Sequence, residues 1–382
     1  VSGSWGLYNG EHRVHTDSIK FEVLYLHSNA TTDALRNVGK RFKPNQTHVV
    51  YAPSLDNRTK LHHDLFKLKA KGFWNTTGYL ASFFREELDA YNQKLIARAP
   101  KYYVEPRFEV PSGATRKIPN PIQAFLEDVA AASETAPGWL GVLLAGPGQG
   151  KTFTSEYLVS KMAQSKKLFP IYINSDQWRT IAPDDFGNLQ KTIIHSFRHF
   201  ETPIGWLEGC EEEFLMVTLK ARLFRIVFDG FDEYVLRNQG RVSAPETLRA
   251  LAKFVEVTGT RIAVTSRTSF WNSEIENVEE YLEGARLSVY TQLPFNTGQA
   301  KNYFSDRLED PKSVERATLL YDSLRKQDEE FVGRGFVLNL LADLIARKTD
   351  DHNSYIDGNP VEWLMRSLCE REQTRQDLSL SP

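Results

Sequence analysis

The sequence predicts an α/β fold, with a parallel sheet covered by helices on both faces between a small α/β domain and a helical domain. Through the middle of the chain, short β-like runs alternate with helical stretches, which is the pattern of a parallel sheet with crossover helices. After Pro294 the pattern becomes helical throughout. With 382 residues, the chain is long enough for two or three domains that each have a core.

The predicted elements follow from apolar runs and from residues that begin helices. The runs that predict central strands are 140–144, 168–174, 224–228, 261–265 and 286–290. Helices are expected from Asn120-Pro121, after Gly150, near Lys191 and near Leu248, and later over 299–308, 317–326, 337–346 and 360–371. In the first domain we expect strands at 20–27 and 47–52 and a helix at 31–41.

Charge and proline content divide the chain into domains. Residues 1–120 contain 18 Lys and Arg against 11 Asp and Glu, a net charge of +7, whereas the remainder has a net charge of −9. Prolines and small polar residues interrupt every apolar period over 110–121. We therefore expect an N-terminal effector or interaction domain over 1–109, a linker over 110–121, a central α/β domain over 122–294 and a helical lid over 295–382.

The composition excludes several classes of protein. Hydrophobic residues make up 41% and charged residues 25%, as in an ordinary globular chain. No apolar run approaches the roughly 18 residues that cross a bilayer, and no signal-peptide pattern opens the sequence. Cys210 and Cys369 are too far apart to indicate a zinc site or a disulfide framework. We expect a soluble, cytoplasmic protein without membrane contact and, since it begins with Val1, a processed or excised fragment.

The first candidate site is the loop after the strand at 140–144. Ala145-Gly-Pro-Gly-Gln-Gly-Lys-Thr152 has the [AG]xxxxGK[ST] form of a phosphate-binding loop, in which main-chain N–H groups and a helix dipole face a phosphate. Lys151 would reach the β- and γ-phosphates, and the Thr152 hydroxyl would bind Mg²⁺. The alternative is an incidental Gly-rich turn, but the strand before it and the helix after it favour a nucleoside triphosphate. The residues expected to bind nucleotide are Gly146, Pro147, Gly148, Gln149, Gly150, Lys151 and Thr152.

Acidic and basic residues follow two other predicted strands. Asp229 would hold Mg²⁺, directly or through water, and either Asp232 or Glu233 would polarise the attacking water. An acidic helix start in a solvated turn is the alternative. Thr265-Ser266-Arg267 would place two hydroxyls and a guanidinium at the same sheet edge, with Arg267 sensing the γ-phosphate unless it only caps the strand. No NKxD guanine signature occurs, which favours an adenine nucleotide.

In this order and spacing, the three motifs resemble those of the NACHT group of STAND NTPases, which includes innate-immune receptors and bacterial antiviral proteins. The specific part is the acidic motif Phe228-Asp-Gly-Phe-Asp-Glu233, alongside the phosphate loop and Val264-Thr-Ser-Arg267. Segments that flank the module in this family also have counterparts, which are Tyr103-Val-Glu-Pro-Arg107, Leu293-Pro-Phe295 and Cys369-Glu-Arg-Glu372. The resemblance covers about 103–371.

The resemblance implies a P-loop NTPase with a five-stranded core, a helical lid, ATP or ADP and Mg²⁺ as cofactors, and slow regulatory hydrolysis. It implies a switch in prokaryotic antiviral defence that exchanges ADP for ATP, opens and forms a homo-oligomer. The trigger, for example a phage protein, would be sensed by a C-terminal region absent here, which has been removed or was never present. Gly333-Arg-Gly-Phe-Val-Leu338 lacks the proline of the family's lid, which leaves the adenine and sugar contacts open.

The N-terminal elements resemble, more weakly, the Mrr-like branch of restriction-endonuclease folds. Such nucleases need an acid followed by Glu-x-Lys to bind Mg²⁺ and assist the attacking water. Asp17 and Glu22 are present, but Leu24 occupies the lysine position, which favours a degenerate or purely interacting domain. The basic run 67–71 would either contact the phosphates of a nucleic acid or form a solvated face.

Two alternative functions stay open at this point. An ATP-driven motor with a basic DNA- or RNA-binding N-terminal domain would turn over fast when nucleic acid is present, whereas a switch would copurify with ADP and turn over poorly alone. A non-hydrolysing binding module would need Lys151 for nucleotide binding and be indifferent to changes of Asp232 and Glu233.

Overall fold

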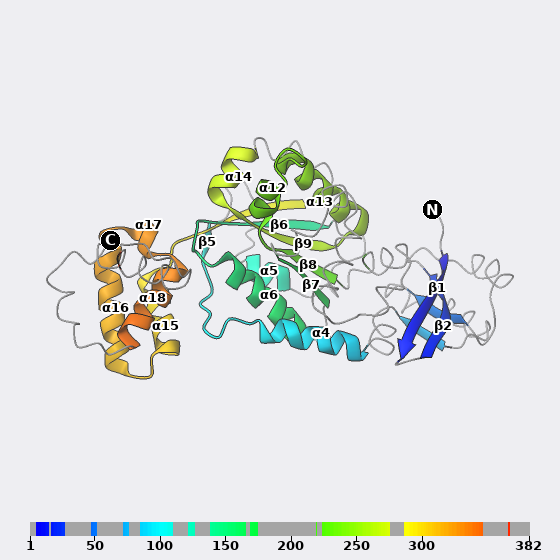
Figure 1. Ribbon diagram of the computed structural model, residues 1–382, viewed down its shortest axis with the longest axis horizontal. Helices are drawn as coiled ribbons and strands as arrows, with labels where there is room; N and C mark the ends of the chain where they lie inside the picture. The colour runs from blue at the N-terminus through cyan, green and yellow to red at the C-terminus, as the bar shows by residue number, and fades with distance from the viewer. Residues whose placement is uncertain are drawn as a thin grey trace, which may run out of the picture.

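The computed structural model describes residues 5–14, 17–26, 47–51, 72–75, 85–109, 121–126, 138–165, 169–174, 219, 224–275, 286–346 and 366. These residues form a central α/β body with a small sheet at one end and a helical bundle at the other (Figure 1). The predicted helices at 31–41 and near Lys191 and the basic run 67–71 lie outside the described residues, as does most of the linker 110–121 and of the helix 360–371.

Within the described ranges the central sheet has six strands, and all but the edge strand β5 are parallel. The strands are β5 Phe108–Glu109, β6 Trp139–Ala145, β7 Phe169–Ile173, β8 Phe224–Phe228, β9 Arg261–Arg267 and β10 Arg286–Gln292. Their order is β5-β10-β6-β9-β8-β7, which confirms the parallel sheet and the five predicted runs. Because β9 pairs with both β6 and β8, it lies between the strand that leads to the Gly-rich loop and the strand that leads to the acids.

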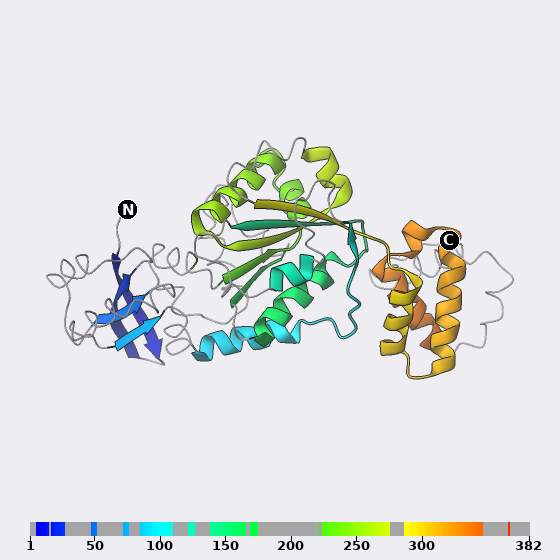
Figure 2. The same cartoon turned by 180° about the vertical axis from the view of Figure 1, so that it is seen from behind.

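Helices cover both faces of this sheet, as the complete burial of β6, β7 and β8 requires. One face carries α4 Arg85–Ala97, α5 Pro121–Leu126 and α6 Lys151–Ser165, and the other α12 Phe231–Arg237, α13 Ala244–Thr258 and α14 Thr268–Glu274 (Figures 1 and 2). Ser243 begins α13 by accepting a hydrogen bond from the Glu246 N–H, and Gly259 ends it with a left-handed φ of 66°. No helix in the described ranges has the length and apolar composition that a membrane crossing requires.

The described C-terminal residues form a helical bundle with a core of its own, here called the lid. Its helices are α15 Thr297–Arg307, α16 Pro311–Arg325, α17 Glu329–Val332 and α18 Gly335–Ala346. Phe304, Tyr321 and Leu341 belong to a hydrophobic cluster distinct from that of the central sheet. The helix α16 begins earlier than the predicted 317 because Asp310 caps it, accepting hydrogen bonds from two backbone N–H groups before the apolar period starts.

The described N-terminal residues form a sheet in the order β1-β2-β3-β4. Its strands are β1 Trp5–Val14, β2 Asp17–Leu26, β3 Thr47–Tyr51 and β4 Gly72–Asn75. The strands predicted at 20–27 and 47–52 are confirmed as β2 and β3. The strand β1 was not predicted, because it has no apolar run and forms by antiparallel pairing with β2. Val23 and Val50 join the hydrophobic cluster of the central domain.

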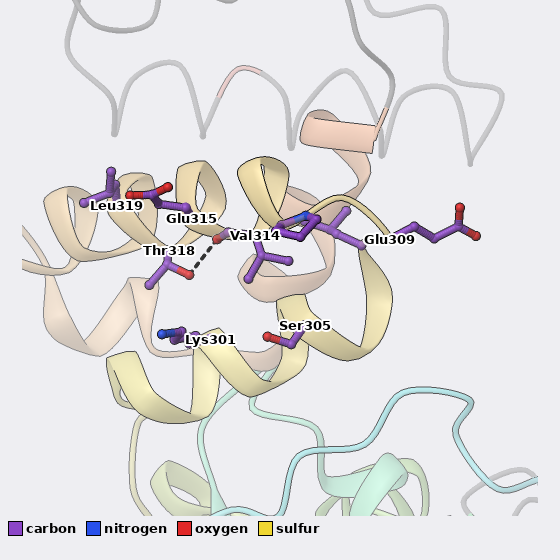
Figure 3. Close-up of a pocket in the computed structure, with 9 residues that line it drawn as sticks. Lys301, Ser305, Glu309, Val314, Glu315, Thr318 and Leu319 are labelled. Atoms are coloured by element: carbon purple, nitrogen blue, oxygen red, sulfur yellow. Dashed lines mark hydrogen bonds between the residues drawn. The ribbon is translucent and has the colours of Figure 1, made fainter.

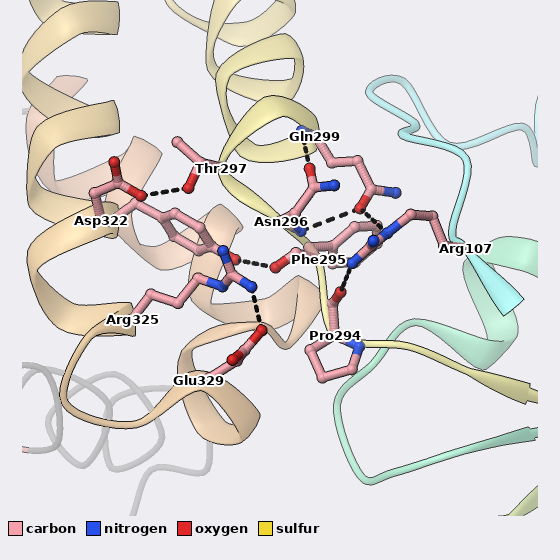
Figure 4. A network of polar contacts seen from close by, with 10 residues as sticks. Arg107, Pro294, Phe295, Asn296, Thr297, Gln299, Asp322, Arg325 and Glu329 are labelled. Atoms are coloured by element: carbon pink, nitrogen blue, oxygen red, sulfur yellow. Dashed lines mark hydrogen bonds and ion pairs between the residues drawn. The ribbon is translucent and has the colours of Figure 1, made fainter. Parts of the chain in front are cut away.

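Residues 98–109, here called the strap, run from the end of α4 to β5 and contact both the central domain and the lid. The Tyr103 ring stacks on that of Tyr157 in α6, with centroids 3.8 Å apart. The Arg107 carbonyl accepts a hydrogen bond from the Leu293 N–H at 2.9 Å. Arg107 Nη2 donates to the Pro294 carbonyl at 3.1 Å and Nε to Gln299 Oε1, in α15 of the lid, at 3.3 Å (Figure 4). These contacts join the strap to the central domain and to the lid.

Candidate functional site

The loop between β6 and α6 folds back tightly on itself. Gly148 and Gly150 have φ values of 72° and 94°, a left-handed conformation that residues with a Cβ rarely adopt. The Gln149 side chain is buried inside the loop, where Oε1 accepts a hydrogen bond from the Gly146 N–H at 2.5 Å. The loop then enters α6 at Lys151. A phosphate bound by the loop would therefore face the positive end of the helix dipole. A parallel sheet whose strand passes through such a loop into a helix is the fold of P-loop NTPases.

The structure brings Lys151 together with the predicted acids and Arg267. Burial lowers the pKa of the Lys151 ammonium, the negative charges of Asp232, Asp229 and Glu233 act to raise it, and the charge of Arg267 lowers it. These residues come from the ends of β6, β8 and β9, which meet at the carboxyl edge of the sheet. The predicted convergence of the three motifs is therefore present.

Asp232 lies in the first turn of α12, which begins after Gly230 in a left-handed conformation with φ 89°. Its side chain is only 1% exposed, and Arg267 Nε lies 3.0 Å from Oδ2. Neither carboxylate oxygen accepts a hydrogen bond from another residue in the described part of the chain. Burial raises the pKa of the Asp232 carboxyl, with Lys151 and then Arg267 opposing the rise. The acidic segment thus does begin a helix, but Asp232 is not in a solvated turn.

Glu233 lies one residue further along α12 in a more open position. Its side chain is 36% exposed and has ion-pair distances of 3.8 Å to Arg237 and 3.9 Å to Arg267. Arg267 itself is 44% exposed and lies between the two carboxylates, so it is more than a surface cap on β9. The two acids that the sequence left as equal candidates therefore differ in burial and in their partners.

Asp229 is buried and accepts hydrogen bonds from three hydroxyls on three elements. Ser155 Oγ in α6 lies 3.2 Å and Thr265 Oγ1 in β9 2.6 Å from Oδ1, and the Tyr172 hydroxyl in β7 lies 3.3 Å from Oδ2. Sequence reasoning missed Ser155 and Tyr172. Ser155 follows Lys151 by one helical turn, and Tyr172 is next to last in β7, which the structure places beside β8. Ser266, by contrast, has a buried hydroxyl without a hydrogen-bond partner among the described residues.

The donors at this edge fit a magnesium ion that is held mostly by ligands other than protein. Mg²⁺ prefers oxygen donors and keeps several waters, so one or two protein oxygens beside substrate phosphates are enough. Thr152 supplies an exposed hydroxyl at the start of α6, and Asp229 supplies a carboxylate whose oxygens already accept hydroxyl hydrogens. Among the described residues, no three His, Cys, Asp or Glu side chains gather into a metal site of protein ligands alone.

The lid rests directly on the Gly-rich loop. The Phe336 N–H, at the start of α18, donates to the Gly148 carbonyl at 3.2 Å. From the central sheet, Gln292 Nε2 at the end of β10 donates to the Gln149 carbonyl at 2.7 Å. A Cβ on Gly148 would lie 2.5 Å from the Phe336 ring. A Cβ on Gly335 would lie 3.5 Å from the Gln149 carbonyl oxygen, so the start of α18 lies beside this loop.

Gly148→Ala should therefore destabilise the protein more than the same change at Gly240, which has a similar φ of 84° and open space where a Cβ would lie. Both variants place a Cβ in a left-handed conformation, at a cost of about 1–2 kcal/mol. Only the change at Gly148 adds the clash with Phe336. Thermal unfolding of both variants measures the difference. Equal losses would show that the lid does not press on the loop.

A separate cavity of about 550 Å³ lies in the lid between α15 and α16 (Figure 3). Its lining includes Lys301, Ser305, Glu309, Thr318 and the exposed Leu319. No residue that the sequence singled out for binding or catalysis lines it, so it is distinct from the site at the carboxyl edge of the sheet.

No protein-family model matches the chain, and comparison with curated proteins gives no match either. Among solved structures, the Aeropyrum pernix ORC1 protein in complex with DNA is 17% identical with a TM-score of 0.38, over 66% of this chain and 65% of that chain. The Aeropyrum pernix ORC2 protein in its ADPNP–ADP complexes is 13% identical with a TM-score of 0.34, over 64% and 71%. Domain III of the Thermotoga maritima replication initiation protein DnaA is 15% identical with a TM-score of 0.35, over 62% and 88%. Likenesses at this level concern the general fold alone.

Proposed function

We propose that the protein is a nucleotide-dependent switch of the NACHT-type STAND class, which binds ATP or ADP with Mg²⁺ and hydrolyses ATP slowly. The observation that supports a switch best is the seating of the lid on the Gly-rich loop through Phe336. Because the lid touches the loop that would hold the phosphates, a phosphate contact made in only one lid position would shift the population of lid positions.

In this proposal the residues from Gly146 to Thr152 bind the phosphates, Lys151 contacts the β- and γ-phosphates, and Thr152 and Asp229 hold the magnesium. The bound magnesium would neutralise charge on the phosphates. Asp232 is the stronger candidate for the base that takes the proton of the attacking water, because its buried oxygens accept no hydrogen bond from another described residue.

In this proposal Arg267 is the residue that distinguishes ATP from ADP. In the present structure its guanidinium lies against Asp232 and Glu233. A γ-phosphate is a doubly charged competitor for the same guanidinium, and arginine binds phosphate oxygens with paired donors. ATP would therefore draw Arg267 from the acids and leave Asp232 free to contact water, whereas ADP would leave the ion pair in place.

The helix α4, which lies between the N-terminal sheet and the central domain in sequence, is linked to this site by two hydrogen bonds. The Tyr91 hydroxyl in α4 accepts a hydrogen bond from the Tyr172 N–H at 3.3 Å, and the Tyr172 hydroxyl donates to Asp229. We assign the N-terminal sheet to an effector or interaction role rather than DNA cleavage, because Leu24, where a nuclease motif has lysine, is buried. The NACHT resemblance supports a role in antiviral defence and a homo-oligomeric active state.

Mass spectrometry of nucleotide released from the purified protein tests this function, together with turnover measured with and without DNA or RNA. A switch should carry ADP and hydrolyse ATP slowly under both conditions. The net positive charge of residues 1–120 favours one competitor, a nucleic-acid motor. Fast turnover that nucleic acid stimulates, from protein purified without nucleotide, would favour the motor.

Phe336→Ala should speed release of bound ADP by about tenfold, since the ring packs over Gly148 and a buried aromatic contact of this kind is worth one to a few kcal/mol. Dissociation of a fluorescent ADP analogue, followed by stopped flow, gives the rate. Leu319→Ala is the matched control, because Leu319 lies exposed on α16 in the same lid. An unchanged rate of ADP release from Phe336→Ala would show that this lid contact does not control nucleotide exchange.

A further inference from the structure

Thr265 joins β9 to two parts of the acidic segment at once. Its Oγ1 donates to Asp229 Oδ1 at 2.6 Å and accepts a hydrogen bond from the Gly230 N–H at 3.0 Å. Gly230 begins α12, and the helix's first turn carries Asp232 and Glu233. One hydroxyl therefore fixes the Asp229 carboxylate and the turn that aims the other two acids.

The next residue on the same side of β9 is Arg267, which contacts the acids in a different way. Thr265 is buried and its contacts are with Asp229 and the main chain of Gly230. Arg267 is 44% exposed and reaches Asp232 through an ion pair alone. If a phosphate binds the Arg267 guanidinium and breaks its ion pair with Asp232, the hydrogen bonds of Thr265 stay in place.

We infer that Thr265 is a positioning residue, which holds Asp229 and the start of α12 in one geometry while Arg267 moves between acid and phosphate. The inference rests on the proposed ATP hydrolysis. Tyr172 supports the same arrangement from β7, since its hydroxyl donates to the second oxygen of Asp229. With three hydroxyl donors, from Ser155, Tyr172 and Thr265, the carboxylate is oriented before any nucleotide binds.

Two substitutions at position 265 separate positioning from packing. Thr265→Val keeps the shape and removes the hydroxyl, whereas Thr265→Ser keeps the hydroxyl and removes a methyl group. We expect Thr265→Val to lower kcat about 30-fold with KM nearly unchanged, and Thr265→Ser to keep kcat within about threefold of wild type. Ser266→Ala is the control on the same strand, because it removes a buried hydroxyl that has no partner among the described residues.

A binding readout accompanies the kinetics. Mg²⁺ should tighten ADP binding less in Thr265→Val than in wild type or Thr265→Ser, because a loosened Asp229 orients magnesium-bound water poorly. Equal kcat and equal magnesium effects in all three proteins would overturn the inference while the proposed function stands. Wild-type protein that neither binds nor hydrolyses nucleotide would instead overturn both. If Thr265→Val does not fold, Tyr172→Phe serves in its place, and the absence of any change in kcat or in the magnesium effect counts against the inference.

Discussion

Replacing Lys151 by alanine should weaken the binding of ATP and ADP by at least about 100-fold. Two charge-assisted hydrogen bonds to phosphate oxygens are worth about 1.5–3 kcal/mol each, and every 1.4 kcal/mol is a factor of ten in affinity. The loss should be this large because burial disfavours the Lys151 charge and lowers its pKa, so a bound phosphate meets a cation that has few waters to give up.

Isothermal titration calorimetry with each nucleotide measures the effect. Lys161→Ala is the control, because Lys161 lies exposed on the same helix, with its ammonium 5.4 Å from the centroid of the Tyr157 ring. The control should bind as the wild type does, so that a loss in Lys151→Ala alone assigns the effect to the loop. Wild-type affinity in Lys151→Ala would mean that the Gly-rich loop binds no phosphate.

Asp232→Asn should lower the rate of ATP hydrolysis by about 10²–10⁴-fold, the usual contribution of a general base, with little change in ADP affinity. Asparagine keeps the shape of the buried side chain but cannot take a proton from water. Glu233→Gln should have a much smaller effect, because Glu233 is partly exposed and lies at ion-pair distance from both Arg237 and Arg267.

Single-turnover hydrolysis with protein in excess over ATP separates the chemical step from product release. Nucleotide affinities of both variants, measured in parallel, serve as the control for folding of the site. A larger loss in Glu233→Gln than in Asp232→Asn would assign the base to Glu233 and leave Asp232 as the partner of Arg267. Full activity in both variants would mean that neither acid is the base, whereas no hydrolysis by the wild type would point to the non-hydrolysing module.

Much of the site could be predicted because its residues directly follow buried strands. Asp229 follows β8 directly, Arg267 ends β9, and Lys151 follows β6 after the Gly-rich loop, and a parallel sheet gathers such positions at one edge. Ser155 and Tyr172 carry no such signal. A serine within a helix and a tyrosine within a strand have the same local sequence whether or not they face a carboxylate, and only the placement of β7 beside β8 brings Tyr172 to Asp229.

The fold could be predicted to the same extent and for the same reason. Strands buried on both faces appear as continuous apolar runs, whereas the seven-residue helices α12 and α14 are too short to show a helical period. The strand β5 was missed because its two residues become a strand only by pairing with β10, which lies far away in sequence. Strand order also depends on such distant pairing, so the place of β9 between β6 and β8 could not be predicted.

The position of β9 between β6 and β8 limits how the chain can vary in length. Thr265 and Arg267 lie on the same side of β9 because they are two residues apart. Inserting or deleting one residue before them, at the turn of Gly259 and Thr260, would turn both to the opposite face of the sheet and bring Ser266 to the acids. The turn is bonded to both neighbouring strands. Thr260 Oγ1 donates to the Phe224 carbonyl at the start of β8 at 2.9 Å, and the Thr260 carbonyl accepts from the Trp139 N–H at the start of β6 at 3.2 Å. Natural relatives should therefore tolerate insertions and deletions elsewhere on the surface but keep the length of this turn.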